Sequence, residues 1–253
     1  MALPVPPPEM RFMGEDEAGF VRIGDEMVAR IGSVVDLGSC RRVLDIGCGY
    51  GRIGAGFVRS TTFRGRYDGF DLLEPHIAWC NAHLGDKRTK FHYLPIYSER
   101  YNPGGTLQQT EVLFDVPDGC ADLIVLTSVF THMYPDDVVH YLRECRRLLS
   151  SRGRVYATFF MMNARQGGRS NVYPLPHELT PFARFMNPEE PLHVIAYTED
   201  WLREQFAAVG LQVDGPIRQG EWSGEPDPFD FQDTVVLSPV GPTAEPARRW
   251  WRR

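Results

Sequence analysis

The sequence lacks any apolar run that approaches about 18 residues, the length that a membrane-spanning helix requires. We therefore expect no segment that crosses a membrane. The N-terminus, Met1-Ala-Leu-Pro-Val-Pro-Pro-Pro, has no basic region followed by an apolar core, so we expect no signal peptide. The five cysteines include no CxxC pair, and their odd number is typical of reduced thiols in a cytoplasmic protein. A structural zinc site is not expected for the same reason.

A concentrated basic character is also missing, since 27 Lys and Arg residues face 33 Asp and Glu residues and the net charge is −6. Nucleic-acid binding needs a basic face that neutralises phosphates, and the sequence shows no basic stripe with interleaved aromatic residues. We therefore expect no nucleic-acid partner. The acidic pair Asp136-Asp137 is interpreted as the partner of a helix dipole, and no metal site is predicted.

The chain does contain enough apolar residues, 43% of 253, for one full core. We expect a single domain over 1–253, with a proline-rich surface segment at 1–14 and a flexible Pro/Arg-rich tail at 242–253. Periodicity predicts strands at 42–46, 67–71, 90–94, 121–127, 154–160, 211–217 and 234–238, and helices at 15–35, 52–59, 76–83, 136–149 and 198–210. This alternation indicates an α/β fold whose mainly parallel sheet has helices on both faces and binds ligands beyond the carboxyl ends of its strands.

Residues 163–197 interrupt the alternation. They hold five prolines and several aromatic residues but show little periodicity. A loop this long within a compact domain is usually functional or disordered. We interpret 163–197 as a substrate lid, whose candidate contacts are Tyr173, His177, Phe182, Phe185 and His193. An ordered surface loop without substrate contact is the alternative.

The sequence is organised around 42–52, which reads Arg-Val-Leu-Asp-Ile-Gly-Cys-Gly-Tyr-Gly-Arg. Its apolar residues suit a buried parallel strand, and Gly47, Gly49 and Gly51 allow a tight turn and the close approach of a ligand. A helix that begins at Arg52 would direct its N-terminus at that ligand. The stretch therefore predicts a nucleotide-type cofactor site.

Three cofactor classes share such a turn. A phosphate-binding P-loop requires GxxxxGK[ST], and no lysine follows these glycines. The dinucleotide fingerprint GxGxxG fails because Arg52 stands where its third glycine belongs, which disfavours a nicotinamide oxidoreductase. The observed pattern instead is Asp45-x-Gly-x-Gly-x-Gly51, with a further acid, Asp71, at the end of the second strand.

This pattern closely resembles the first motif of the class I S-adenosylmethionine-dependent methyltransferases, and the resemblance spans about residues 40–240. Gly69-Phe-Asp71 resembles the second motif, 122–132 the fourth strand and the segment after it, and 148–155 the entry to the fifth strand. Four motifs in family order and spacing make the resemblance specific. It implies a Rossmann-like three-layer sandwich with a seven-stranded sheet of order 3-2-1-4-5-7-6, in which strand seven is antiparallel.

The resemblance also implies roles for individual residues. Asp71 is expected to accept hydrogen bonds from the ribose hydroxyls, and Asp45 to support the turn. Where the family commonly has an acid after strand three, this sequence has Pro95, so Ile96 or backbone groups are expected beside the adenine. The complete set of expected cofactor contacts is Asp45, Gly47, Cys48, Gly49, Gly51, Asp71, Leu72, Ile96, Thr127 and Ser128.

The absence of two motifs narrows the range of possible methyl acceptors. The [DNS]PP[YFW] motif of nucleic-acid amino-methylating enzymes and the paired glutamates of protein arginine methyltransferases are missing, which favours a small molecule. An alcohol acceptor loses a proton during in-line transfer, and a histidine suits that task. We predict His132 as general base, with His177 as second candidate, and a sugar, glycoside or phenolic acceptor. Lining of the pocket wall is the other interpretation of His132.

Rival functions are N- or C-methylation of a small molecule and a non-catalytic S-adenosylmethionine-binding partner protein. The sequence leaves the oligomeric state open, a homodimer included.

Overall fold

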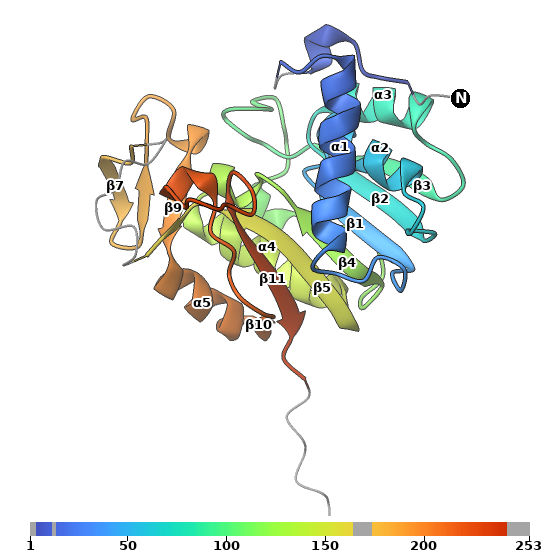
Figure 1. Cartoon of the computed structure of the whole chain (residues 1–253). Coiled ribbons are helices and arrows are strands. Elements are labelled where there is room, and N and C mark those ends of the chain that lie inside the picture. Colours follow the sequence, from blue (N-terminus) through green and yellow to red (C-terminus); the bar gives the residue numbers. More distant parts are fainter. Residues whose placement is uncertain (1–3, 12–13, 164–173, 242–253) are drawn as a thin grey trace, which may run out of the picture.

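A seven-stranded sheet forms the centre of the protein (Figure 1). The computed structural model describes residues 4–11, 14–163 and 174–241. Across the sheet the strands are β3 (Thr89–Tyr93), β2 (Arg66–Asp71), β1 (Arg42–Ile46), β4 (Ala121–Leu126), β5 (Leu149–Phe159), β11 (Asp233–Pro239) and β10 (Leu211–Val213). β11 pairs antiparallel with β5 and β10, while the pairs from β3 to β5 are parallel. The predicted order and the antiparallel last strand are confirmed.

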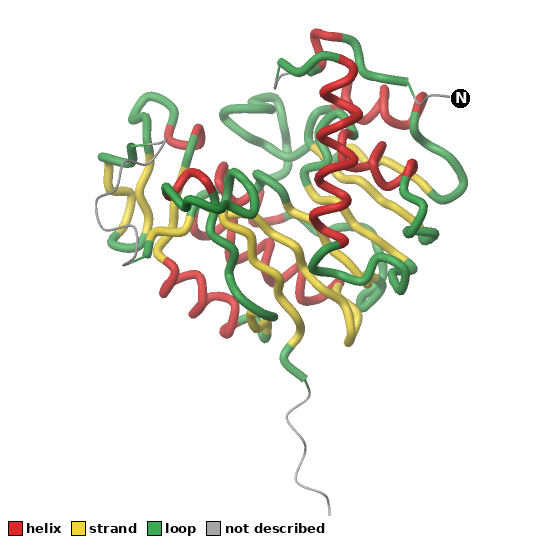
Figure 2. Tube along the Cα trace, viewed as in Figure 1, coloured by secondary structure: helices red, strands yellow, loops and turns green. Residues whose placement is uncertain are grey.

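Helices cover both faces of this sheet, as Figure 2 shows. They are α1 (Glu17–Gly32), α2 (Arg52–Arg59), α3 (Glu74–His83), α4 (Pro135–Leu148) and α5 (Glu199–Ala208). Side chains alternate between the faces of a strand. Val43 of β1 therefore packs with α1, α2 and α3, whereas Leu44 packs with α4 and α5. The result is the expected three-layer sandwich.

The interpretation of 163–197 as a segment without regular structure is wrong for its described part. Residues 174–197 contribute β7 (His177–Thr180), β8 (Ala183–Phe185) and β9 (Ile195–Thr198) to a second sheet, which β6 (Met161–Met162) completes in the order β6-β9-β8-β7. Strands of two to four residues are too short to show a period, and burial of side chains such as Ile195 and Tyr197 stabilises them instead. Tyr173 lies outside the described residues.

Smaller differences concern the ends of elements. β5 begins five residues earlier than predicted, and β10 ends at Val213 instead of continuing to 217. The tail 242–253 lies outside the described residues. Among the residues that the structure describes, no helix is long and apolar enough to span a membrane.

Candidate active site

A cleft of about 620 Å³ lies beyond the carboxyl ends of β1, β2 and β4. Nine of the predicted site residues line it: Gly47, Cys48, Gly49, Asp71, Leu72, Ile96, Thr127, Ser128 and His132. They come from four strand ends that the parallel topology brings to one edge of the sheet. The predicted constellation is therefore one site in the folded chain.

The glycine turn allows a ligand to approach the backbone closely. Gly47 has a φ of +78°, and a Cβ there would lie 2.4 Å from Val129 Cγ2. Gly49 has a φ of +55°, yet a Cβ there would meet nothing within 4 Å. Because Gly49 lines the cleft, its missing side chain leaves room on the ligand's side.

Gly49→Ala should therefore leave the fold largely intact and weaken cofactor binding. The left-handed backbone costs an alanine about 1–2 kcal/mol, and the new methyl group would occupy the cleft. We expect the affinity for S-adenosylhomocysteine, measured by calorimetry, to fall at least about tenfold, or about 1.4 kcal/mol. Gly119→Ala is the matched control, because Gly119 also has a positive φ of +63° and open space around it but does not line the cleft. Equal affinities of the two variants would contradict the assignment.

Asp71 ties the second strand to this turn. Its Oδ2 accepts a hydrogen bond from the Gly49 amide at 2.7 Å, and its Oδ1 accepts one from the Leu73 amide at 2.9 Å. Burial raises the pKa of the carboxyl group, while these backbone donors counteract the shift. Each carboxylate oxygen can accept a further hydrogen bond, so Asp71 is able to bind two hydroxyl groups of a ligand.

Asp45 and Gly51 lie behind the cleft and do not line it. Asp45 is fully buried and accepts a hydrogen bond from the Tyr67 hydroxyl, and burial raises its pKa to about 7. Gly51 is the N-cap of α2, where a Cβ would lie 2.7 Å from Cys80 Sγ. Asp45 pairs with Tyr67 and Gly51 caps α2, so a direct cofactor contact of either residue stays a prediction.

The segment after β4 is held by a hydrogen-bond chain. Ser128 is the one non-glycine with positive φ in the described chain, at +55°. Its amide donates to Thr158 Oγ1 at 2.8 Å, and that hydroxyl donates to Gln232 Oε1 at 2.6 Å. Gln232, which the sequence reading missed, also lines the cleft. The chain fixes Thr127 and Ser128 against β5 and the start of β11.

His132 ends a 3₁₀ turn, Phe130–His132, at the same edge. Its Nδ1 lies 2.8 Å from the Leu192 carbonyl oxygen, which requires Nδ1 to carry the proton and leaves Nε2 as the accepting nitrogen. Burial, together with the nearby Arg100 charge, lowers the pKa of His132 to about 4. The imidazole is therefore neutral throughout the physiological pH range.

The structure does not bring His177 to this site. It lies on β7, where its ring packs 5.2 Å from that of Phe185, and it is not among the cleft-lining residues. From the same insert, His193 and Val194 do reach the cleft.

Loops supply several of the lining residues that the sequence did not predict. Ser98, Arg100 and Tyr101 come from the aperiodic segment after β3, and the Tyr101 ring lies edge-on to that of His132 at 5.5 Å. Arg100 forms an ion pair with Glu190, which is 90 positions away. No local pattern marks such residues, because their positions depend on contacts between distant loops.

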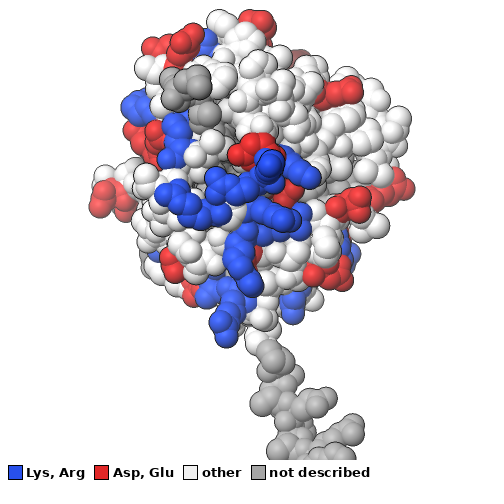
Figure 3. Space-filling view, turned by 90° about the vertical axis from the view of Figure 1, so that its right-hand side faces the viewer, with Lys and Arg blue, Asp and Glu red and all other residues white. Residues whose placement is uncertain are grey.

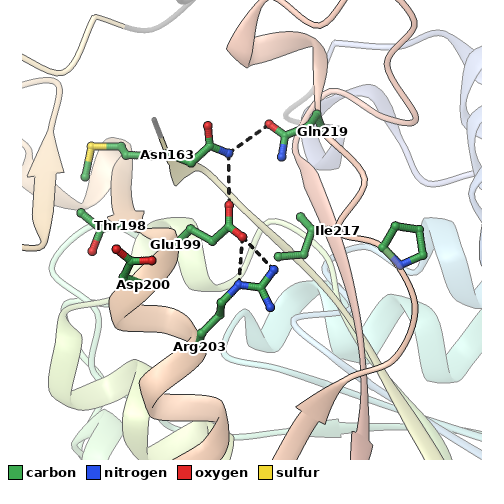
Figure 4. A pocket seen from close by; sticks show the side chains of 9 residues that line it. Asn163, Thr198, Glu199, Asp200, Arg203, Ile217 and Gln219 are labelled. Carbon is green, nitrogen blue, oxygen red and sulfur yellow. Dashed lines mark hydrogen bonds and ion pairs between the residues drawn. The ribbon is translucent and has the colours of Figure 1, made fainter. Parts of the chain in front are cut away.

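A second hollow of about 740 Å³ opens at the start of α5 (Figure 4). Several of its polar side chains pair with one another: Asn163 Nδ2 donates to Glu199 Oε2 at 3.2 Å, and Arg203 Nε donates to Glu199 Oε1 at 2.9 Å. None of the predicted site residues lines it. Among the described residues, no group of three or more His, Cys, Asp and Glu side chains is arranged to hold a metal ion.

Cationic side chains gather on the face that carries the β3 edge, as Figure 3 shows. The sequence reading did not foresee this band, because the net charge averages over the whole surface. Its exposed members are Arg41, Arg64, Arg66, Lys87, Arg88 and Lys90. They stand at the amino ends of β1, β2 and β3, at the opposite end of the sheet from the glycine turn, so the band is not part of the cleft.

Comparison with known proteins gives a family for this arrangement. A family model described as a methyltransferase domain matches residues 44–157, which include the glycine turn, Asp71 and His132. The insert and the last two strands of the sheet lie outside this match.

Solved structures share the fold. The 1,6-didemethyltoxoflavin N1-methyltransferase of Burkholderia thailandensis, solved with 1,6-didemethyltoxoflavin and S-adenosylhomocysteine, is 18% identical with a TM-score of 0.57, over 94% of this chain and 92% of that one. LaPhzM is 17% identical with a TM-score of 0.54, over 88% of this chain. The O-methyltransferase NcsB1 from neocarzinostatin biosynthesis, in complex with S-adenosylmethionine and 2-hydroxy-5-methyl naphthoic acid, is 16% identical with a TM-score of 0.54, also over 88%. This chain spans 57% of the length of LaPhzM and of NcsB1.

The match to a methyltransferase domain and the strand order are both consistent with a cofactor site at the glycine turn and at Asp71, at the end of β2. Residues 44–157 match a methyltransferase domain, and the chain has the Rossmann-like fold of an S-adenosylmethionine-dependent methyltransferase.

Proposed function

We propose that this methyltransferase methylates a hydroxyl group of a small molecule and that His132 removes the hydroxyl proton. S-Adenosylmethionine supplies the activated methyl group when it is bound. The Asp71 carboxylate can accept hydrogen bonds from its ribose. The open space at Gly49 leaves room for the part of the cofactor that lies against the glycine turn. The cleft volume of about 620 Å³ lies in the range of about 300–1,000 Å³ that is usual for small-molecule sites. Two of the solved structures compared above contain 1,6-didemethyltoxoflavin or 2-hydroxy-5-methyl naphthoic acid, both small molecules, which agrees with this class.

The hydrogen bond between His132 Nδ1 and the Leu192 carbonyl oxygen carries the proposal. It fixes the ring and its tautomer, so Nε2 is the atom that takes a proton. A lysine or a protonated histidine at this position would have no free lone pair. The neutral form of His132 is secured by the lowered pKa.

The same lowered pKa favours an acidic acceptor. A base whose conjugate acid has a pKa of about 4 has little driving force to deprotonate an alkyl alcohol. A phenolic hydroxyl, with a pKa of about 10, is far more acidic. Among the acceptors that the sequence suggests, we therefore favour a phenolic compound over a sugar or glycoside.

Transfer of label from methyl-labelled S-adenosylmethionine tests this proposal. The protein is incubated with one panel of phenols and one of sugars and glycosides, and labelled products are identified by mass spectrometry. We expect O-methylated phenols. Label on nitrogen or carbon would replace the proposal by the N- or C-methyltransferase alternative. Tight binding of S-adenosylhomocysteine without transfer to either panel or to a metabolite extract would favour a non-catalytic partner protein.

A further inference from the structure

The half of the cleft beyond the glycine turn presents cationic side chains and lacks acidic ones. Among the described lining residues Asp71 is the only carboxylate, and it stands at the cofactor end. Around His132 the lining residues that carry or can carry a positive charge are Arg100 and His193. This local excess is notable in a chain of net charge −6. A cleft for a neutral acceptor has no need of a guanidinium group, whose desolvation is costly.

Arg100 is held in place from two sides. Its Nη1 pairs with the carboxylate of Glu190, which belongs to the loop between β8 and β9. Its guanidinium carbon lies 5.1 Å from the centre of the Tyr101 ring. Only 21% of the Arg100 side chain is exposed. These contacts fix the planar group, so its remaining donors have defined directions.

One of those donors has no acceptor. Arg100 Nε is buried, and no hydrogen-bond partner for it exists within the part of the chain that the structure describes. Glu190 accepts a hydrogen bond from Nη1, which lies on the opposite edge of the guanidinium group from Nε. Nε is therefore left for another acceptor. A buried unpaired donor of this kind costs about 1–3 kcal/mol, and more for a charged group. A ligand that accepts from Nε recovers that free energy.

Arg100 lies on the same side of the cleft as His132, the predicted base. The Arg100 charge is one of the causes that lower the pKa of His132, and Tyr101, its neighbour in sequence, packs against the His132 ring. His193 Nδ1 lies 3.7 Å from Glu190 Oε2, so Glu190 already neutralises part of the local charge. Arg100 and Glu190 cancel in formal charge, so the unpaired Nε donor, and not a net positive charge, favours an anionic ligand here. A planar carboxylate suits the planar guanidinium group.

We propose that Arg100 determines specificity by binding a carboxylate of the acceptor, which places the hydroxyl group next to His132. The acceptor class is then a small hydroxyaryl carboxylate. The inference rests on the proposed function, because it assumes that this half of the cleft holds the acceptor.

Two matched probes test the inference by calorimetry on the complex with S-adenosylhomocysteine. 2-Hydroxybenzoate and 2-hydroxybenzamide have nearly the same shape, but only the first carries a negative charge. We expect the wild-type protein to bind the carboxylate at least about tenfold more tightly, a difference of about 1.4 kcal/mol. In Arg100→Gln this preference should vanish while the affinity for S-adenosylhomocysteine stays the same. Glu190→Gln, which removes the competing carboxylate, should strengthen binding of 2-hydroxybenzoate.

Arg203→Gln is the control, because Arg203 also pairs with a glutamate, Glu199, but lines the hollow at α5 and not the cleft. It should keep the preference. Should Arg100→Gln fail to fold, Arg100→Lys serves instead, since it keeps the charge without the fork and should retain only part of the preference. Equal affinity for both probes, or no binding of either by a protein that binds S-adenosylhomocysteine, overturns the inference and leaves the proposed function standing. Failure to bind S-adenosylhomocysteine overturns both.

Discussion

Asp71→Ala should weaken the binding of S-adenosylhomocysteine by about 10²–10⁴-fold. The Asp71 carboxylate already accepts the Gly49 and Leu73 amides and has lone pairs left for two ribose hydroxyls. A hydrogen bond to a charged group contributes about 1.5–3 kcal/mol, so two of them account for this range. Loss of the Gly49 contact would also release the turn against which the cofactor binds. Calorimetry on the purified variant measures the change.

Asp68→Ala is the control for this experiment. Asp68 lies on the same strand and is also buried, but it pairs with Arg42 at 2.8 Å and His92 at 3.0 Å away from the cleft. Its removal should lower the melting temperature and leave the affinity for S-adenosylhomocysteine unchanged. Asp71→Asn keeps an acceptor oxygen for the turn, so it provides the test if the alanine variant does not fold. Wild-type affinity in a folded Asp71 variant would exclude the ribose-binding role.

The cleft lining around the glycine turn was predictable because its signals are local. A short apolar strand, a glycine turn and an acid at the end of the next strand each occupy a few consecutive residues. Parallel topology then brings strand ends together without further information. Asp45, which was expected to support the turn, has its side chain in the layer with Tyr67, while the cleft lies beyond the strand's end.

The acceptor half could be predicted only in part. His132 was found from its place after β4, but its ring is oriented by the carbonyl of Leu192, 60 positions away. Gln232 reaches the site through Thr158, 74 positions away, and Arg100 through Glu190. These contacts join segments without periodicity, so the pattern methods that locate helices and strands have no signal to detect.

The strands of the insert were not predicted for the same reason, since they depend on contacts with other segments of the chain. Residues 183–185 and 195–198 form strands because they pair with each other and bury side chains such as Tyr197, which packs 5.0 Å from Trp201 of α5. Strand preference in so short a segment is decided by such neighbours and not by composition. His177 was proposed from its residue type and its place in the insert, and the pairing of β7 with β8 places it away from the cleft lining.

His132→Asn should lower turnover by about 10²–10⁴-fold, the usual contribution of a general base. The asparagine amide can replace Nδ1 as donor to the Leu192 carbonyl, so the loop contact survives while the proton-accepting Nε2 is lost. Turnover of a phenolic acceptor is the measurement, with the affinity for S-adenosylhomocysteine expected to stay unchanged. His140→Gln is the matched control, because His140 Nε2 also lies near a carbonyl, that of Val112, at 2.7 Å, but His140 does not line the cleft. Near-normal turnover of His132→Asn would reduce His132 to a contact that holds the loop.

The pH profile gives an independent test of the same residue. Burial lowers the pKa of His132 from its ordinary 6.5 to about 4, so the base form is present above that value and is lost as the pH falls through it. Turnover should therefore show no loss centred near pH 6.5 on the acid side, although an unperturbed histidine would produce one. The same shift affects stability: between pH 6.5 and about 4 the unfolded chain binds the proton and the folded one does not, so stability falls as the pH is lowered through this window. His132→Asn should remove this part of the acid destabilisation, which denaturant melts at pH 5 and pH 7 measure. A wild-type profile with an acidic limb at pH 6.5 that disappears in His132→Asn would contradict the buried, neutral state of the imidazole.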